Sequence, residues 1–322
     1  MQKQNDFQEK LQKCMIGYEK NITANMKSNP KRFFSYLSSK RKIKESLNGI
    51  KDPNGNLLGS PSEVADELGK FFKSTFIVEE DGDIPKLENQ TEAEINDLQF
   101  AIDEVKKLLC DLNISKSIGP DNVHPKLLKA LGSNIDFVES LTLLFQKCYD
   151  CSQLPKIWKS ANITALHKKG DKSESCNYRP ISITSTISKI FEKIVRNHIL
   201  QHVYPFIVQQ QHGFLPKVSC ISNLLECMNV IYDILEDDEC VDVLYLDFQK
   251  AFDTVGHKRL LSKLEAYGVT GRTKDIVKDF LTDRYFRVKV GSTFSKNYKV
   301  TSGVPQGPRV GTWSSFVPDL YK

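Results

Sequence analysis

The chain has 322 residues, 40% of them hydrophobic, so it is long enough to bury a substantial core, and we expect two domains. Its net charge of +5 is compatible with a nucleic-acid partner but too small to indicate one. The polar start excludes a secretory signal there, and no stretch is apolar enough to span a membrane, which predicts an intracellular location, in the cytoplasm or nucleus. The 8 cysteines are scattered, which favours free thiols in a reducing compartment.

The first 47 residues have a helical pattern and are strongly basic around an aromatic cluster. Aromatic side chains among cations are typical of surfaces that bind single-stranded nucleic acid, through stacking and phosphate attraction. A solvated helix whose aromatics pack on the next domain fits the pattern equally well. The candidate nucleic-acid-binding residues are Lys40, Arg41 and Lys42, and the aromatic cluster is Phe33, Phe34 and Tyr36.

Three further features complete an N-terminal region that we place at residues 1–98. An Asn-Gly pair within residues 51–56 predicts a tight hairpin turn, because this pair readily adopts positive φ angles. Residues 62–76 are predicted to form a helix. Residues 77–98 are acidic and interrupted by Pro and Gly, which predicts a linker. The buried face of the helix would carry Val64, Leu68, Phe71 and Phe72.

The next region contains a glycine loop and a basic hairpin. Gly119 is free to take unusual backbone angles, and Pro120 is predicted to open the following helix. A turn at Gly170 and Asp171 predicts a hairpin over residues 163–181. Arg makes planar, bidentate contacts to phosphate oxygens and Lys supplies a point charge, so this hairpin predicts a phosphate contact, with a charged surface hairpin as the alternative. Its cations are Lys168, Lys169 and Arg179.

The most informative stretch is residues 243–254. Four apolar or aromatic residues lead to Asp247 and predict a buried strand that ends at this acid. A carboxylate there is well placed to bind a hard cation, although Asp247 taken alone is more simply a strand cap. Asp253 is predicted to cap a helix that runs through Leu260, Leu261 and Leu264 and stops at Gly268. A hairpin is predicted from residues 284–290 and 297–301.

Two pairs of metal-binding residue types occur in the middle of the chain. Cys148 and Cys151 form a CxxC pair, and His198 and His202 lie one helical turn apart. The gap between the pairs is much too long for a zinc finger, and His198 continues an amphipathic stripe. A structural role is therefore favoured over a zinc site. The stripe also contains Ile190, Phe191, Ile194 and Val195.

Five sequence blocks follow one another between residues 100 and 307. They are residues 116–128, residues 154–159 with 177–182 and 188–193, residues 211–214, residues 245–253, and residues 301–307. Together they resemble the reverse transcriptases of non-LTR (LINE-type, jockey-like) retrotransposons, which copy RNA into DNA at a target-site primer. The resemblance implies an α+β fold with a mostly antiparallel sheet and packed helices. It also implies polymerase fingers at residues 99–240 and an incomplete palm at residues 241–307.

The resemblance assigns roles to individual residues. Asp247 would share two Mg²⁺ ions with two further acids, and Phe248 would add its backbone carbonyl. Phe252 would lie beneath the sugar and exclude a 2′-hydroxyl, and Gln306 would contact the template and the incoming base. The incoming triphosphate would be bound by Arg179 with Lys168 or Lys169. The implied partners are an RNA template, a DNA primer and deoxynucleoside triphosphates, with no membrane.

The chain departs from the family pattern after Gly307. The aromatic-Ala-Asp-Asp hairpin that carries the second and third acids is absent from the sequence, and a lone carboxylate cannot hold two divalent ions against their repulsion. We therefore expect a fragment without a thumb, inactive alone, or alternatively a non-catalytic nucleic-acid-binding remnant or a pseudogene product. A frameshift or misjoined exon would explain the aberrant tail at residues 308–322. Gly256 stands where the family usually has Pro, which would loosen that turn.

Overall fold

The computed structural model divides into two compact units, Met1–Asn48 and Gly49–Lys322. Residues 49–98 therefore belong to the same unit as the main sheet, while the division into fingers and palm stays a prediction. The structure describes residues 2–30, 33, 34, 36, 37, 49–79, 82, 84, 87–208, 210–213, 215–247 and 249–305. The tail at residues 308–322 lies outside this part of the chain.

The N-terminal unit contains the helix α1, Gln2–Ala24, as the helical pattern predicts. Tyr36 packs edge-on against Tyr18, with ring centroids 5.8 Å apart, and its hydroxyl donates a hydrogen bond to the Glu19 carboxylate. Tyr36 of the aromatic cluster therefore packs within its own unit, whereas Phe34 is exposed. The predicted nucleic-acid-binding residues Lys40, Arg41 and Lys42 lie outside the described residues.

The second unit begins with the predicted hairpin and helix. The strands β1 (Ile50–Lys51) and β2 (Leu57–Leu58) pair antiparallel, and Asp52 accepts backbone hydrogen bonds within the turn. The positive φ angle of this turn belongs to Gly55, at +86°, so the glycine alone of the Asn-Gly pair supplies it. The helix α3, Pro61–Ser74, then buries Val64, Leu68 and Phe72, while Phe71 is half-buried.

The main sheet has five strands, in the order β4-β3-β5-β6, with β7 also paired to β5. Three pairings are antiparallel, and β3 runs parallel to β5. The α+β class and the mostly antiparallel sheet are therefore confirmed, as are the two predicted hairpins. The strands are β3 (Ser160–His167), β4 (Tyr178–Ile183), β5 (Tyr285–Val290), β6 (Thr293–Phe294) and β7 (Tyr298–Lys299).

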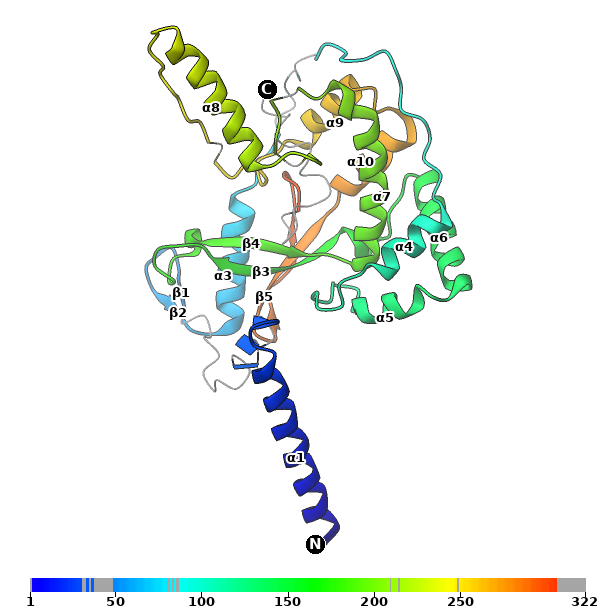
Figure 1. Cartoon of the computed structure of the whole chain (residues 1–322), viewed down its shortest axis with the longest axis vertical. Helices are drawn as coiled ribbons and strands as arrows, with labels where there is room; N and C mark the ends of the chain where they lie inside the picture. The colour runs from blue at the N-terminus through cyan, green and yellow to red at the C-terminus, as the bar shows by residue number, and fades with distance from the viewer. Residues whose placement is uncertain are drawn as a thin grey trace. The chain divides into compact units, whose positions relative to one another are not determined.

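One face of this sheet packs against α3 (Figure 1). Alternate β5 residues point to this face, so Phe286 and Val288 are buried while their neighbours are not. Phe286 stacks on Tyr298 at 5.4 Å, and the Tyr298 ring lies against Gly69 of α3. A side chain at position 69 would overlap this ring, which explains a glycine in the middle of a helix.

The larger core lies among the remaining helices. Phe100, Phe145, Tyr149, Trp158 and Phe191 form one aromatic cluster, with Phe100 stacked on Phe191 at 5.3 Å. The predicted amphipathic stripe on α7 is buried in this core. The helices are α4 (Ile102–Cys110), α5 (Pro125–Leu131), α6 (Ile135–Asp150), α7 (Thr186–Val203), α9 (His257–Ala266) and α10 (Gly271–Leu281), with the short 3-10 helices η1 (Lys156–Lys159), η2 (Ser175–Asn177) and η3 (Tyr204–Phe206).

The acidic stretch at residues 77–98 is more than the linker that its composition predicts. Ile95 donates its backbone N–H to Gly268, and Leu98 donates to the Tyr149 hydroxyl. Leu98 is 8% exposed and belongs to the core. Because Ile95 and Leu98 pack against the core, the end of the stretch is an ordered part of the folded unit that lies along the helices.

The prediction that Pro120 opens a helix is wrong. The next helix, α5, begins at Pro125, where His124 caps it by accepting a hydrogen bond from the Lys126 backbone. Gly119 is needed for close packing and not for an unusual φ angle. A Cβ there would lie 2.7 Å from the Thr184 carbonyl oxygen.

The helix α8, Cys220–Glu236, buries none of its residues. Apolar side chains such as Ile221 and Leu224 are more than half exposed on it. Among the described helices, none combines the length and the apolar character that crossing a bilayer requires.

Candidate active site

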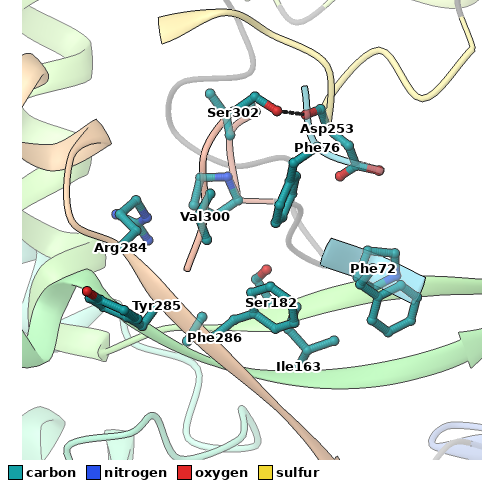
Figure 2. A pocket seen from close by; sticks show the side chains of 15 residues that line it. Phe72, Phe76, Ile163, Ser182, Asp253, Arg284, Tyr285, Phe286, Val300 and Ser302 are labelled. Carbon is teal, nitrogen blue, oxygen red and sulfur yellow. Dashed lines mark hydrogen bonds between the residues drawn. The ribbon is translucent and has the colours of Figure 1, made fainter. Parts of the chain in front are cut away.

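Two segments distant in sequence are joined next to the sheet. Gly303 donates its backbone N–H to Val255 at 2.8 Å, and Val304 donates to Phe252 at 2.8 Å. The Ser302 hydroxyl donates to the Asp253 carbonyl oxygen at 2.6 Å, the contact drawn in Figure 2. These bonds hold residues 252–255 against residues 302–304, so the two motif-bearing segments share one local structure.

Gly303 makes this approach possible. Its φ angle is +80°, a region that residues with a Cβ rarely adopt. A Cβ at this position would also lie 2.5 Å from the Phe252 carbonyl oxygen and 2.8 Å from Asp253 Cα. Backbone angle and packing both therefore require glycine.

His257 adds a side-chain bond to the same junction. Its Nε2 lies 2.9 Å from the Gly303 carbonyl oxygen, and since a carbonyl only accepts, Nε2 carries the proton and donates. Burial lowers the pKa of His257 below its ordinary value of 6.5, and the bond to Gly303 partly opposes that shift. The residue is therefore a neutral donor that positions the turn before Pro-Gln-Gly.

The helix after this junction is not capped as the sequence predicts. Its first residue is His257, too far along the chain for Asp253 to be the N-cap, and that prediction is wrong. The Glu79 carboxylate accepts from the backbone N–H of Lys258 at 2.8 Å and of Arg259 at 3.4 Å. A Cβ at Gly256 would overlap the Glu79 carboxylate, so the glycine leaves room for this remote cap. The stop at Gly268, with φ +76°, is confirmed.

The stretch before Asp247 is not the buried strand that its apolar run predicts. Residues 241–247 form no strand, and Leu244, Tyr245 and Leu246 are more than 80% exposed. A strand needs a partner for its backbone groups, and no described strand pairs with this stretch. Asp247 is accordingly exposed, and among the described residues it belongs to no group of three or more His, Cys, Asp or Glu side chains that could hold a metal ion.

The other residues assigned near Asp247 are placed only in part. Phe252 is half-buried against the core, and its carbonyl oxygen accepts the bond from Val304. Phe252 therefore packs against the core, and its sugar-facing role stays a prediction. Phe248 and Gln306 lie outside the described residues.

The predicted basic hairpin forms as expected. Leu166 pairs with Arg179 across β3 and β4, and Lys168 closes the ladder by donating its N–H to Asn177 at 2.8 Å. The turn uses Gly170 with φ +84°. Among the described residues, no carboxylate pairs with any of the three exposed cations Lys168, Lys169 and Arg179.

A cavity of about 40 Å³ lies between α3, the sheet and residues 300–305 (Figure 2). It has room for a few water molecules and is far too small for a nucleotide. Arg284 lines it and is 2% exposed. The guanidinium donates to the Phe280 carbonyl oxygen at 3.0 Å and lies 4.2 Å from the Phe280 ring centre. Burial lowers the pKa of Arg284 to about 10, so it remains a cation that fastens α10 to the sheet.

The cysteine and histidine pairs do not form a metal site. His198 and His202 each direct Nε2 at a backbone carbonyl oxygen, of Asn96 at 2.7 Å and of Tyr267 at 2.9 Å. Burial raises the pKa of the Cys148 thiol to about 11, which disfavours the thiolate that zinc binds. Within the described ranges, no group of three or more His, Cys, Asp or Glu side chains could hold an ion.

Comparison with known proteins decides the family. The model of the family "Reverse transcriptase (RNA-dependent DNA polymerase)" matches residues 166–313, which begin at the end of β3 and include β4 and both joined segments. The chain belongs to the reverse transcriptases of non-LTR retrotransposons. In this family divalent metal ions serve nucleotide transfer, although the described residues of this chain do not form a two-metal site.

Similar curated proteins come from mobile elements. The chain is 28% identical to the probable RNA-directed DNA polymerase from transposon BS of Drosophila melanogaster, over 84% of this chain and 31% of that protein. It is 31% identical to the RNA-directed DNA polymerase from mobile element jockey of the same species, over 68% of this chain and 24% of that protein. A third relative, the Pol polyprotein from retrotransposable element R1 of Bradysia coprophila, is 27% identical over 65% of this chain and 20% of its own length. The chain thus spans less than a third of each.

Three residues that organise this junction were not predicted from the sequence. Glu79 was hidden because a capping side chain from 179 residues away leaves no local pattern. His257 lies after one recognised motif and Gly303 lies within another, yet neither residue type indicates by itself a bond between them. The positive φ of Gly303 follows a Thr-Ser pair, which offers a weak turn signal.

Proposed function

We propose that this chain takes part in RNA-directed DNA synthesis as the fingers and part of the palm of a retrotransposon polymerase. The family match supports the proposal, and the observation that carries it is the junction of residues 252–257 with residues 302–304. This junction would hold the segment after Asp247 beside the Pro-Gln-Gly segment. The fingers would span residues 99–240, and the partial palm residues 241–307.

The incoming deoxynucleoside triphosphate would be bound by the β3–β4 hairpin. Arg179 offers a planar fork for phosphate oxygens, and Lys168 or Lys169 adds a point charge. All three are exposed and without carboxylate partners among the described residues, so their charge is available to an anion. Phe252 would exclude a 2′-hydroxyl, and Gln306 would contact template and base.

Nucleotide transfer needs more metal-binding carboxylates than the sequence of this chain supplies in the family's pattern. We assign Asp247, with the Phe248 carbonyl, to Mg²⁺ binding, but one carboxylate does not fit a two-ion site. A polypeptide of these 322 residues should therefore bind RNA and deoxynucleoside triphosphate without extending a DNA primer. Lys40, Arg41 and Lys42 would add to RNA binding through phosphate contacts.

Nucleotide binding tests the proposal directly. Equilibrium binding of a fluorescent deoxynucleoside triphosphate should weaken about ten-fold or more in Arg179→Ala, the loss of a charge-assisted bidentate contact. Lys106→Ala, an exposed cation on α4, is the matched control and should bind like the unchanged chain. Equal loss in both variants, or no nucleotide binding at all, would contradict the proposal.

A non-catalytic RNA-binding module is the second candidate, because the described residues assemble no cluster of acids. Primer extension on an RNA template with Mg²⁺ separates the two. Salt-dependent RNA binding without nucleotide binding would favour the module. Templated extension that disappears in Asp247→Asn would show that other groups complete the catalytic site and that the chain is active alone.

A further inference from the structure

The main sheet has a second face that α3 does not cover. On β3 this face carries Asn162, Thr164 and Leu166, and the register brings the odd-numbered residues of β5 to the same side. Thr164 is exposed, and Leu166 and Tyr285 are 56% and 42% exposed. Among the described elements α3 makes the extensive helix contacts with this sheet, on the other face, so the positions of Thr164 and Leu166 are open to solvent while Asn162 is 8% exposed.

This open face is basic and aromatic. Arg287 extends over the Phe294 ring at 3.9 Å, and Lys289 lies 5.6 Å from the same ring centre. The Cα pairing of Lys289 with Phe294 places both on the face that carries Arg287. No described carboxylate pairs with Arg287 or Lys289. Lys299, at the edge beside Tyr285, forms an ion pair with Asp283 at 3.2 Å, so its charge is already compensated.

The open face is also held rigid. The Arg287 Nε donates to the Asn162 side-chain oxygen at 2.9 Å, and Asn162 is 8% exposed. This bond fixes Arg287 with its guanidinium carbon over the Phe294 ring, while no described carboxylate pairs with its outer N–H groups. A fixed cation on an aromatic ring, beside a second cation, is prearranged to receive a phosphate and an unpaired base.

We propose that this sheet face, defined by Tyr285, Arg287, Lys289 and Phe294, binds single-stranded RNA. The inference rests on the proposed function, which brings RNA to the chain, and adds a surface separate from the Pro-Gln-Gly junction. Unpaired bases can stack on the exposed Tyr285 ring and on the Arg287 guanidinium that covers the half-buried Phe294 ring, whereas duplex bases are already stacked inside the helix. The two cations supply the phosphate attraction, and Arg179 lies on the same face towards the hairpin tip.

The test uses fluorescence anisotropy with a single-stranded RNA oligonucleotide and a duplex RNA of equal length. Phe294→Leu should weaken single-strand binding about ten-fold, because the ring that holds the Arg287 guanidinium in place for a base and its phosphate is lost. The plot of log affinity against log salt has a negative slope. Lys289→Gln should make this slope shallower by about 0.7, the value for one phosphate contact in a single strand. Lys106→Gln is the control and should change neither quantity. Unfolding midpoints of all variants establish that the sheet is intact.

The outcomes separate this surface from the polymerase assignment. Unchanged RNA affinity in folded Phe294→Leu and Lys289→Gln would overturn the surface. So would duplex binding equal to single-strand binding, which would indicate a general polyanion site. Nucleotide binding should be unaffected in both variants. If nucleotide binding is absent but RNA binding depends on Phe294, the surface stands while the polymerase role fails.

Discussion

The His257 imidazole donates a hydrogen bond to the Gly303 carbonyl oxygen across 46 residues of sequence, at 2.9 Å. This bond joins the first turn of α9 to the turn that leads into Pro-Gln-Gly. The donor is the Nε2 proton, which the neutral ring and the imidazolium can both carry, while burial opposes the charged form and makes the junction sensitive to pH. The backbone bonds beside it depend on a glycine, and the helix that presents His257 depends on a remote carboxylate.

Stability should fall when the pH drops below the ordinary His pKa of 6.5, because the pKa of His257 is lowered in the folded state. Between that value and the folded pKa, the unfolded chain binds more protons than the folded one, so acid favours unfolding. Above pH 6.5 the imidazole is neutral in both states, so His257 no longer makes the stability depend on pH. Urea unfolding of the unchanged chain and of His257→Gln, which retains a donor, should show a shallower acid loss in the variant. Parallel pH profiles would contradict this role.

Gly303→Ala should destabilise the chain by about 2 kcal/mol or more, the combined effect of an unfavourable φ and a backbone clash. Gly291→Ala is a matched control, because Gly291 also has a positive φ, +61°, but open space around it. Its effect should be about 1 kcal/mol. Denaturant midpoints measure both. Equal effects would mean that the close approach to Phe252 and Asp253 does not matter.

Glu79→Ala should cost about 0.5–2 kcal/mol, the usual effect of removing a helix N-cap. Glu79→Gln keeps an acceptor but loses the charge at the helix start, so it should cost less. Glu94→Ala removes an exposed acid from the same acidic stretch, residues 77–98, and should be nearly neutral. Thermal unfolding of the three variants distinguishes these cases, and a Glu94 effect as large as that of Glu79 would argue for general charge loss.

Cys148 should resist alkylation in the native chain. Its thiol is 7% exposed with a pKa of about 11, so about one part in a thousand is thiolate at pH 8. The exposed Cys110, Cys176 and Cys240 should react first. Timed iodoacetamide treatment followed by peptide mass spectrometry measures this order. Early labelling of Cys148 would show that the α6 core opens more readily than its packing implies.

Local patterns were sufficient wherever one short segment contains its own partners. The β3–β4 hairpin, the apolar face of α3 and the stop of α9 at Gly268 were all predicted, because turn residues and periodicity lie within a few positions of each other. The ordered motifs likewise identified the family. The sequence by itself therefore determined the family, the α+β class and the candidate residues.

Tertiary structure decided what depends on distant partners. The run before Asp247 has strand composition but is exposed, since a strand also needs a neighbour for its backbone groups. Asp253 has the residue type of a cap, yet Glu79 caps α9 because folding brings residues 179 positions apart together. Local preferences amount to about 1 kcal/mol per residue. Long-range packing and hydrogen bonds outweigh these preferences at residues 241–247 and at the start of α9. Residues nearby in the sequence therefore do not predict the structure there.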